Sequence, residues 1–267
     1  MKFNQKDHLK KIARKGGLAR IRLYGNPGTS SGRKLGGQMA IKIHRHSTSS
    51  PFVARKFSPP SFSEDLSEFV GIVLGDGGVS ARQVTITLHK HDDKDYANYV
   101  ANLIKKIFNI SIVPKERANQ NVNTIVLSRT LLVEFLKSMG ITVGSKTRNQ
   151  VMVPDWIRGN LDCRKKCLRG LFDTDGCFYI DKHVIKNKIY KNPGMNFTNR
   201  SIPLLLFFKD TLTEMGFGPT QISKYSVVLR KEENIVRYFG EIGSSNPKHI
   251  NKFRAYLQEK GRVPKRS

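Results

Sequence analysis

The chain has 267 residues, which is enough for one large domain or two small ones with an arm. Its 47 Lys and Arg outweigh 21 Asp and Glu, a net charge of +26 that predicts a polyanionic partner, nucleic acid before all others. No run of about 18 apolar residues is present, so we expect no membrane partner. Three cysteines cannot all pair, which suits a reducing compartment, and we expect an intracellular protein of the cytoplasm or of an organelle.

Residues 1–60 differ from the rest of the chain in composition. They hold fourteen Lys or Arg and a single acid, Asp7, and they are dense in glycine. The pairs Gly16-Gly17 and Gly36-Gly37 argue against a continuous amphipathic helix. We expect a basic, Gly-rich arm that orders along a phosphate backbone. The alternative is a solvated tail without a defined role.

The first half of the remaining sequence begins with an apolar run at 69–77. This run carries Gly71 and Gly75 four residues apart and ends in Asp76-Gly77, which predicts a short buried helix. The elements expected after it are a strand at 84–89, a helix opened by Asp92 or Asp93, strands near 111–114 and 124–127, and a helix at 130–139.

The second half repeats this order, starting from a similar run at 168–176 that ends in Asp175-Gly176. The expected elements are strands at 177–180 and near 195–198, a helix at 201–215, a strand at 225–229 and a helix at 233–242. A Lys-rich insertion at 181–193 suits either a hairpin along a groove or a solvated loop. We therefore predict an α+β protein of duplicated αββαββα repeats with pseudo-twofold symmetry, divided into an arm at 1–60, a first repeat at 61–160, and a second repeat with a basic C-terminal helix or tail at 161–267.

Two carboxylates follow from this duplication. Small residues at i and i+4 let two helices approach closely, so the paired motif helices should place Asp76 beside Asp175. A helix C-terminus already carries partial negative charge, and two acids there repel unless cations bridge them. Paired carboxylates of this kind predict divalent metals, as in enzymes that cut phosphodiesters.

Both motifs resemble the nine-residue signature of the LAGLIDADG homing endonuclease family, in its two-motif, single-chain form. The resemblance covers roughly residues 65–255, and in the first copy Leu74 departs from it by replacing the earlier acid. The matching positions are Gly71, Asp76 and Gly77 in the first copy, and Leu168, Gly170, Leu171, Asp173, Asp175 and Gly176 in the second.

The resemblance implies two saddle-shaped antiparallel sheets around a central two-helix seam. It implies a monomeric endonuclease, free-standing or intron-encoded, that makes a double-strand break in double-stranded DNA at a long site. Asp76 and Asp175 would hold Mg²⁺ or another divalent cation, helped by the carbonyls of Gly75 and Thr174. Lys146 and Lys248 would stabilise transition-state charge, although Arg148 competes for that role and surface lysines without a role are the alternative.

Outward polar residues of the two sheets should contact DNA. Two other functions remain open on the same scaffold, an RNA-binding maturase with intron RNA as its partner, and a DNA-binding regulator that does not cleave. The predicted DNA contacts are Arg82, Thr85, Thr87, His89, Arg117, Arg129, Lys182, Lys186, Lys188, Asn196, Thr198, Lys224 and Arg230.

Overall fold

A computed structural model describes residues 5–46, 57–118 and 120–261, and the chain separates into two compact units, Met1–Arg55 and Lys56–Ser267. The first unit contains helix α1 (Gln5–Tyr24) and helix α2 (Ser30–His46). Both helices run through their glycine pairs, so the expectation that glycine would prevent a helix was wrong. Most of the residues flanking the glycines are good helix formers such as Lys, Arg, Leu and Ala, and they outweigh the glycine penalty.

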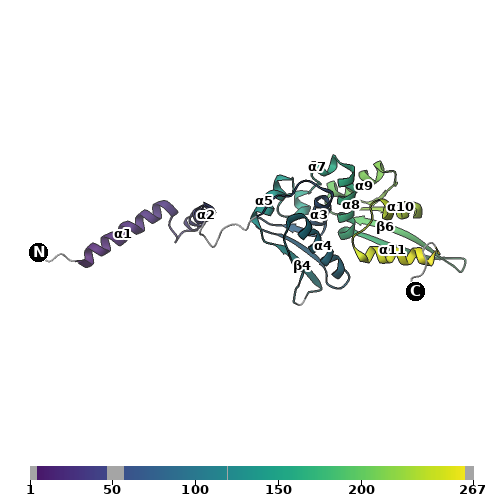
Figure 1. The fold of residues 1–267 in the computed structure, drawn as a ribbon, viewed down its shortest axis with the longest axis horizontal. Coiled ribbons are helices and arrows are strands. Elements are labelled where there is room, and N and C mark those ends of the chain that lie inside the picture. The colour runs from purple at the N-terminus through teal and green to yellow at the C-terminus, as the bar shows by residue number, and fades with distance from the viewer. Residues whose placement is uncertain (1–4, 47–56, 119, 262–267) are drawn as a thin grey trace. The chain divides into compact units, whose positions relative to one another are not determined.

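The second unit consists of two repeats with the same architecture (Figure 1). Each repeat has one four-stranded antiparallel sheet, with strand orders β1-β2-β4-β3 and β5-β6-β8-β7. The expected duplicated α+β fold is thereby confirmed. The elements of the first repeat are α3 (Glu64–Gly75), β1 (Gly77–Val79), β2 (Val84–His89), α4 (Lys94–Phe108), β3 (Lys115–Glu116), β4 (Val122–Leu127), α5 (Thr130–Ser138), α6 (Lys146–Asn149) and α7 (Asp155–Arg158).

The second repeat follows directly. Its elements are α8 (Leu161–Asp175), β5 (Gly176–Ile185), β6 (Lys188–Thr198), α9 (Ile202–Glu214), β7 (Thr220–Ser223), β8 (Ser226–Leu229), α10 (Glu232–Glu241) and α11 (Pro247–Glu259). One hydrophobic core runs through both repeats, from Leu66 of α3 to Tyr256 of α11. Helices α3 and α8 lie side by side at its centre (Figure 1).

The duplication extends to how helices end. Helices α5 and α9 are each followed by a glycine in the left-handed region, Gly140 at φ 102° and Gly216 at φ 76°. In both cases the next residue donates its N–H back into the helix, Ile141 to Leu136 and Phe217 to Leu212. Only glycine adopts this backbone conformation without strain, so both helix ends are fixed by sequence.

Two differences from the expected elements have local causes, and one of the open alternatives is decided. The strand expected at 111–114 begins at Lys115, because Pro114 has no N–H for the ladder. Strand β7 was missed because all four of its residues are exposed, which leaves no alternation in the sequence. The insertion at 181–193 is a hairpin, and its turn residues Lys186 and Asn187 have φ of 48° and 62°, as a two-residue hairpin loop requires.

Candidate functional site

The two motif helices α3 and α8, here called the seam, touch through their backbones. A Cβ placed on Gly71 would lie 2.3 Å from the carbonyl oxygen of Cys167, and one on Gly170 would lie 2.4 Å from that of Glu68. No side chain larger than hydrogen fits at these crossing points. The small residues of the motifs therefore serve close helix approach, as the spacing predicted.

The glycines after each motif aspartate lie at or just past the helix ends, as expected, but not in the left-handed conformation. Gly176 has a φ of −95°, and neither it nor Gly77 is among the residues with positive φ. A Cβ on Gly77 would lie 2.5 Å from the carbonyl oxygen of Val73, and one on Gly176 would lie 2.4 Å from that of Phe172. Glycine is needed there because the chain turns straight from helix into strand against the last helical turn, and a left-handed cap is not formed.

The seam brings Asp76 and Asp175 together at one end. Asp76 is the C-cap of α3 and Asp175 is the last residue of α8. A Cβ on the neighbouring Gly75 would lie 3.4 Å from Oδ2 of Asp175. Burial, followed by the charge of Asp175, raises the pKa of Asp76 to about 7. Burial also raises the pKa of Asp175, while Lys146 and a 2.8 Å hydrogen bond from Nδ2 of Asn199 oppose that rise.

Lys146 reaches this pair of acids from the first repeat. The hydroxyl of Ser145 caps the short helix α6, which holds Lys146 at its first position. The Lys146 ammonium donates a hydrogen bond to the carbonyl oxygen of Gly75. Burial lowers the pKa of Lys146, although Asp175 and Asp76 both oppose this. A cleft of about 240 Å³ opens beside it, with Asp175 and Asn199 also in its wall.

Lys248 is held differently, so the two predicted lysines are not equivalent. Its Nζ donates to Oδ1 of Asp93 at 2.9 Å, and Nδ2 of Asn246 donates to the same oxygen at 2.9 Å. Burial alone would raise the pKa of Asp93, but these two bonds hold it below its usual value. Lys248 still acts on the carboxylate pair at longer range, because its charge lowers the pKa of Asp76.

The two residues predicted to offer carbonyls to a metal are both close to the acids. The carbonyl oxygen of Gly75 accepts the bond from Lys146. The hydroxyl of Thr174 donates back into α8, to the carbonyl oxygens of Gly170 and Leu171 at 3.0 Å each. The Thr174 side chain therefore stays within its own helix.

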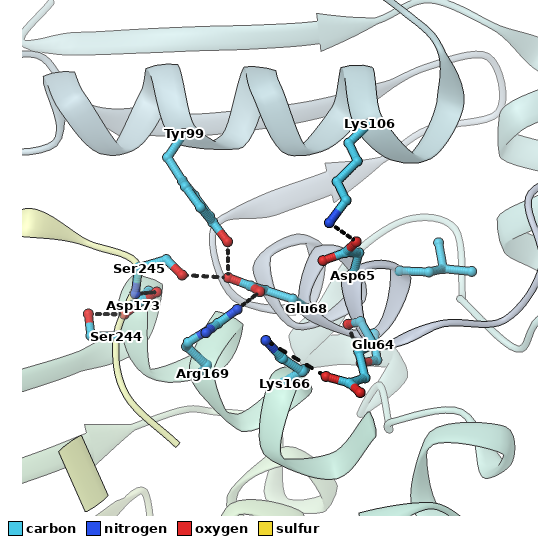
Figure 2. Close-up of polar contacts among 12 residues, drawn as sticks. Glu64, Asp65, Glu68, Tyr99, Lys106, Lys166, Arg169, Asp173, Ser244 and Ser245 are labelled. Carbon is cyan, nitrogen blue, oxygen red and sulfur yellow. Dashed lines mark hydrogen bonds and ion pairs between the residues drawn. The ribbon is translucent and has the colours of Figure 1, made fainter. Parts of the chain in front are cut away.

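A buried polar network crosses the seam (Figure 2). Glu68 of α3 is fully buried and forms an ion pair with Arg169 of α8. The hydroxyls of Tyr99 and Ser245 donate to Oε1 of Glu68 at 2.7 and 2.8 Å. The signal for this network lay in the motifs themselves, where an acid directly precedes the first apolar run and Arg169 interrupts the second.

Asp173 belongs to the same network and is also buried. Its carboxylate accepts hydrogen bonds from the hydroxyl of Ser244 and, at 2.7 Å, from the backbone N–H of Ser245. Burial raises its pKa to about 7 in spite of those bonds. The loop between α10 and α11 is thus anchored on α8, which places Asn246 and Lys248 near the end of the seam.

The predicted DNA contacts on the strands can be assigned to a face of the sheet, because alternate residues of a strand point to opposite faces. Thr85, Thr87 and His89 alternate with the buried Val84, Ile86 and Leu88, so they line the face of the first sheet away from the core. Asn196 and Thr198 alternate with the buried Met195 and Phe197 in the same way, and Lys188 shares their parity on β6.

Lys182 does not belong to this face. Lys182 lies four residues after the buried Phe178 on β5 and so points to the same face of the sheet. Its charge acts on Glu259 of α11. The expectation that Lys182 points to the open face was wrong, because the long hairpin continues the alternation set by the core. The remaining predicted contacts lie at strand ends, Arg82, Arg117, Lys186 and Lys224 in loops, and Arg129 and Arg230 just after β4 and β8.

A metal at this site would have few protein ligands. Among the described residues, no group of three or more His, Cys, Asp and Glu side chains could hold a metal ion. The Asp76–Asp175 pair offers hard carboxylate oxygens, which suit Mg²⁺, Ca²⁺ or Mn²⁺. Within the same described part of the chain, no helix is both long and apolar enough to cross a membrane.

Residues 162–243 match the family model described as LAGLIDADG-like domain. The chain is 23% identical over 205 residues to the replication factor C small subunit of Methanocaldococcus jannaschii, covering 76% of this chain and 11% of that protein. It is 27% identical over 208 residues to the tRNA-splicing ligase RtcB of Methanopyrus kandleri, covering 67% and 20%. The chain therefore spans about a tenth to a fifth of the length of these curated relatives.

Solved structures resemble the chain over both repeats. I-SmaMI bound to its uncleaved DNA target in the presence of calcium ions superposes with a TM-score of 0.50 and 9% identity, covering 75% of this chain and 93% of that one. The LAGLIDADG meganuclease I-AabMI bound to uncleaved DNA gives a TM-score of 0.47 and 12% identity, covering 74% and 93%. At these identities the likeness to I-SmaMI shows a shared fold.

Proposed function

We propose that this chain, whose residues 162–243 belong to the LAGLIDADG-like domain family and whose two repeats have the LAGLIDADG fold, is a divalent-cation-dependent, site-specific DNA endonuclease. One observation carries the proposal. Two half-buried carboxylates, Asp76 and Asp175, meet at the end of two interlocked helices, with the Lys146 ammonium beside them. Such a pair is electrostatically costly, and a purely structural role does not explain it.

The cation would be held by Asp76 and Asp175, with DNA phosphate oxygens and water completing its coordination. Mg²⁺ suits this set because it binds through few carboxylates and keeps several waters. When bound, it would supply an activated water and charge stabilisation at the leaving oxygen. That I-SmaMI was solved with its DNA target and calcium supports this proposal.

The chain's own residues would divide the remaining work. Asn199 holds the Asp175 carboxylate by its 2.8 Å hydrogen bond and so fixes the direction of its free oxygen. Lys146 would place a positive charge next to the scissile phosphate, where charge develops during cleavage. The open faces of the two sheets would bind a double-stranded DNA site, Thr85, Thr87 and Asn196 reading bases while basic residues at strand ends contact phosphates. One chain contains both halves, so it would act as a monomer.

Asp76→Asn and Asp175→Asn test the proposal, since each removes a charge with little change of shape. Each variant should lose cleavage of a selected target in Mg²⁺ yet bind the same DNA in Ca²⁺ within a few-fold of wild type. Asp162→Asn is the matched control, because Asp162 is exposed in the first turn of α8. Cleavage retained by both site variants would refute the assignment. A selection of nucleic acids bound by the wild-type protein that recovers only RNA would also refute it.

Lys146 and Lys248 provide a second test of the geometry. Lys146→Met should lower the cleavage rate by about 10²–10³, the usual loss when one charge-stabilising donor is removed. Lys248→Met should cost less, because Asp93 already engages that ammonium. Single-turnover rates at saturating protein separate these effects from DNA affinity. Equal losses of cleavage rate in the two variants would contradict the different positions of Lys146 and Lys248.

A further inference from the structure

The α1–α2 unit carries a large excess of positive charge. Residues 5–46 contain eleven Lys and Arg and one acid, Asp7. Lys10, Lys11, Arg14 and Lys15 are exposed, and none of them forms a salt bridge with another residue that the structure describes. Lys10 with Arg14 and Lys11 with Lys15 are like-charge pairs at i and i+4, which destabilise a helix in water. A polyanion bound along the helix would remove that repulsion.

Five of the charges lie on one side of α1, whereas Arg20 lies on the opposite side. At 100° per residue, Lys11, Lys15 and Arg22 fall within an arc of about 40°, and Arg14 and Lys10 follow on one side of that arc. We call these five residues the basic face. From Lys11 to Arg22 it extends for roughly 16 Å at the helical rise. That length compares with the ~12 Å width of a DNA major groove, so the face can reach phosphates on both sides of it.

The turn between α1 and α2 is held by defined hydrogen bonds and close packing, so the two helices form one unit. Gly25 ends α1 in the left-handed region at φ 75°, and Thr29 Oγ1 accepts the N–H of Gly32 at the start of α2. Gly32 packs against Asn26 so closely that a Cβ would lie 1.8 Å from the Asn26 carbonyl oxygen. Arg33 donates to the carbonyl oxygen of Gly28 at 3.3 Å. Such a turn fixes the chain direction between the helices.

The mid-helix glycines have no explanation within the described part of the unit. A Cβ on Gly16, Gly17 or Gly37 would meet nothing within 4 Å, and their φ values are not left-handed. Glycine in a helix interior is unfavourable relative to alanine, so these positions weaken the helices without any internal gain. Gly17 lies about 20° around α1 from Lys10, at the edge of the basic face, and its bare backbone lets a DNA strand approach closely there.

We propose that the α1–α2 unit binds double-stranded DNA through its backbone phosphates, as a second contact region separate from the sheets. The contact would be independent of sequence, since lysine and arginine on phosphate carry no base information. It would add affinity on DNA flanking the recognised site. The choice of DNA over other polyanions rests on the function proposed above.

The test uses the full chain with the triple variant K11Q/R14Q/K15Q. Its matched control is K105Q/K137Q/K231Q, which removes exposed lysines from α4, from α5 and from the N-cap of α10. Binding to a 30-bp duplex of unrelated sequence is measured in Ca²⁺ over a series of salt concentrations. Removing one lysine or arginine from a phosphate should reduce the slope of log affinity against log salt by about 0.9. We expect the slope of the arm variant to fall by about 2 to 3 units, and the control to keep the wild-type slope.

A second full-chain variant, G17A, keeps the charge and strengthens the helix, and G16A, on the far side of α1, is its control. Both should show more helix by circular dichroism, but only G17A should bind DNA more weakly, the opposite of what a merely structural role predicts. A wild-type salt slope in the triple variant would overturn the proposal. So would an equal reduction in the control, or better competition by an RNA duplex or anionic vesicles than by DNA. If the salt slopes come out as expected but the wild-type protein never cleaves DNA, only the proposed nuclease activity is refuted. If the wild-type protein cleaves DNA but the triple variant keeps the wild-type salt slope, only the proposed DNA contact of the α1–α2 unit is refuted.

Discussion

Gly170→Ala perturbs the seam at one of its close backbone crossings. The new Cβ would lie 2.4 Å from the carbonyl oxygen of Glu68 and 2.9 Å from the backbone N of Ile72. Ordinary contact begins at 3.4 Å, so the two helices must part by about 1 Å. Both contacts are backbone atoms, which cannot turn aside as a side chain could.

The expected change in the free energy of unfolding follows from two opposing effects. Overpacking a well-packed core costs about 1–3 kcal/mol, and the contact with backbone atoms favours the upper end. Replacing a mid-helix glycine by alanine returns about 1 kcal/mol of helix propensity. We expect a net loss of about 2 kcal/mol in the free energy of unfolding. At about 2–4 °C per kcal/mol for a unit of this size, Tm should fall by about 4–8 °C.

Gly240→Ala in α10 is the matched control, because a Cβ there meets nothing within 4 Å. It should raise Tm slightly, since only the helix propensity changes. Thermal and urea unfolding of the three proteins measure the difference. Cleavage should also fall in Gly170→Ala by about 10²-fold, because a shift of about 1 Å moves Asp175 away from Asp76. A Gly170→Ala protein as stable as Gly240→Ala would refute close backbone packing at the seam.

Two further predictions concern buried charges. Without metal, the folded chain holds the Asp76 proton up to a pKa of about 7, while the unfolded chain releases it near 3.8. Ionisation therefore favours unfolding as pH rises, so the stability advantage of Asp76→Asn over wild type should grow from about pH 4 to pH 7 and then level off. Urea titrations in chelator at a series of pH values measure it, and an advantage that shrinks with pH would contradict the burial of Asp76. Glu68→Gln should cost about 3 kcal/mol of unfolding free energy by leaving the partly buried Arg169 without its partner. Lys106→Met breaks the exposed ion pair with Asp65 and should leave Tm unchanged. If Tm fell by a similar amount in Glu68→Gln and Lys106→Met, the buried ion pair would stabilise the fold no more than the exposed one.

The repeated fold was predictable because its determinants are local. Alternation in 84–89 and 195–198, apolar faces at helical spacing, and Gly140 and Gly216 at helix ends each act within a few residues of the chain. The motif glycines likewise predicted a close helix pair. Errors arose where local rules compete, as in α1, whose helix formers outweighed Gly16 and Gly17.

What the sequence by itself determined is the duplication, the seam and the meeting of Asp76 with Asp175, since hydrophobic period and small-residue spacing fix them. Only the tertiary structure decided the partners of each polar group. The ion pair of Glu68 with Arg169, the bond of Asn199 to Asp175 and the capture of Lys248 by Asp93 join residues far apart in the chain. Such pairings depend on distances set by packing, and in sequence each residue is an ordinary polar side chain with many equivalent partners.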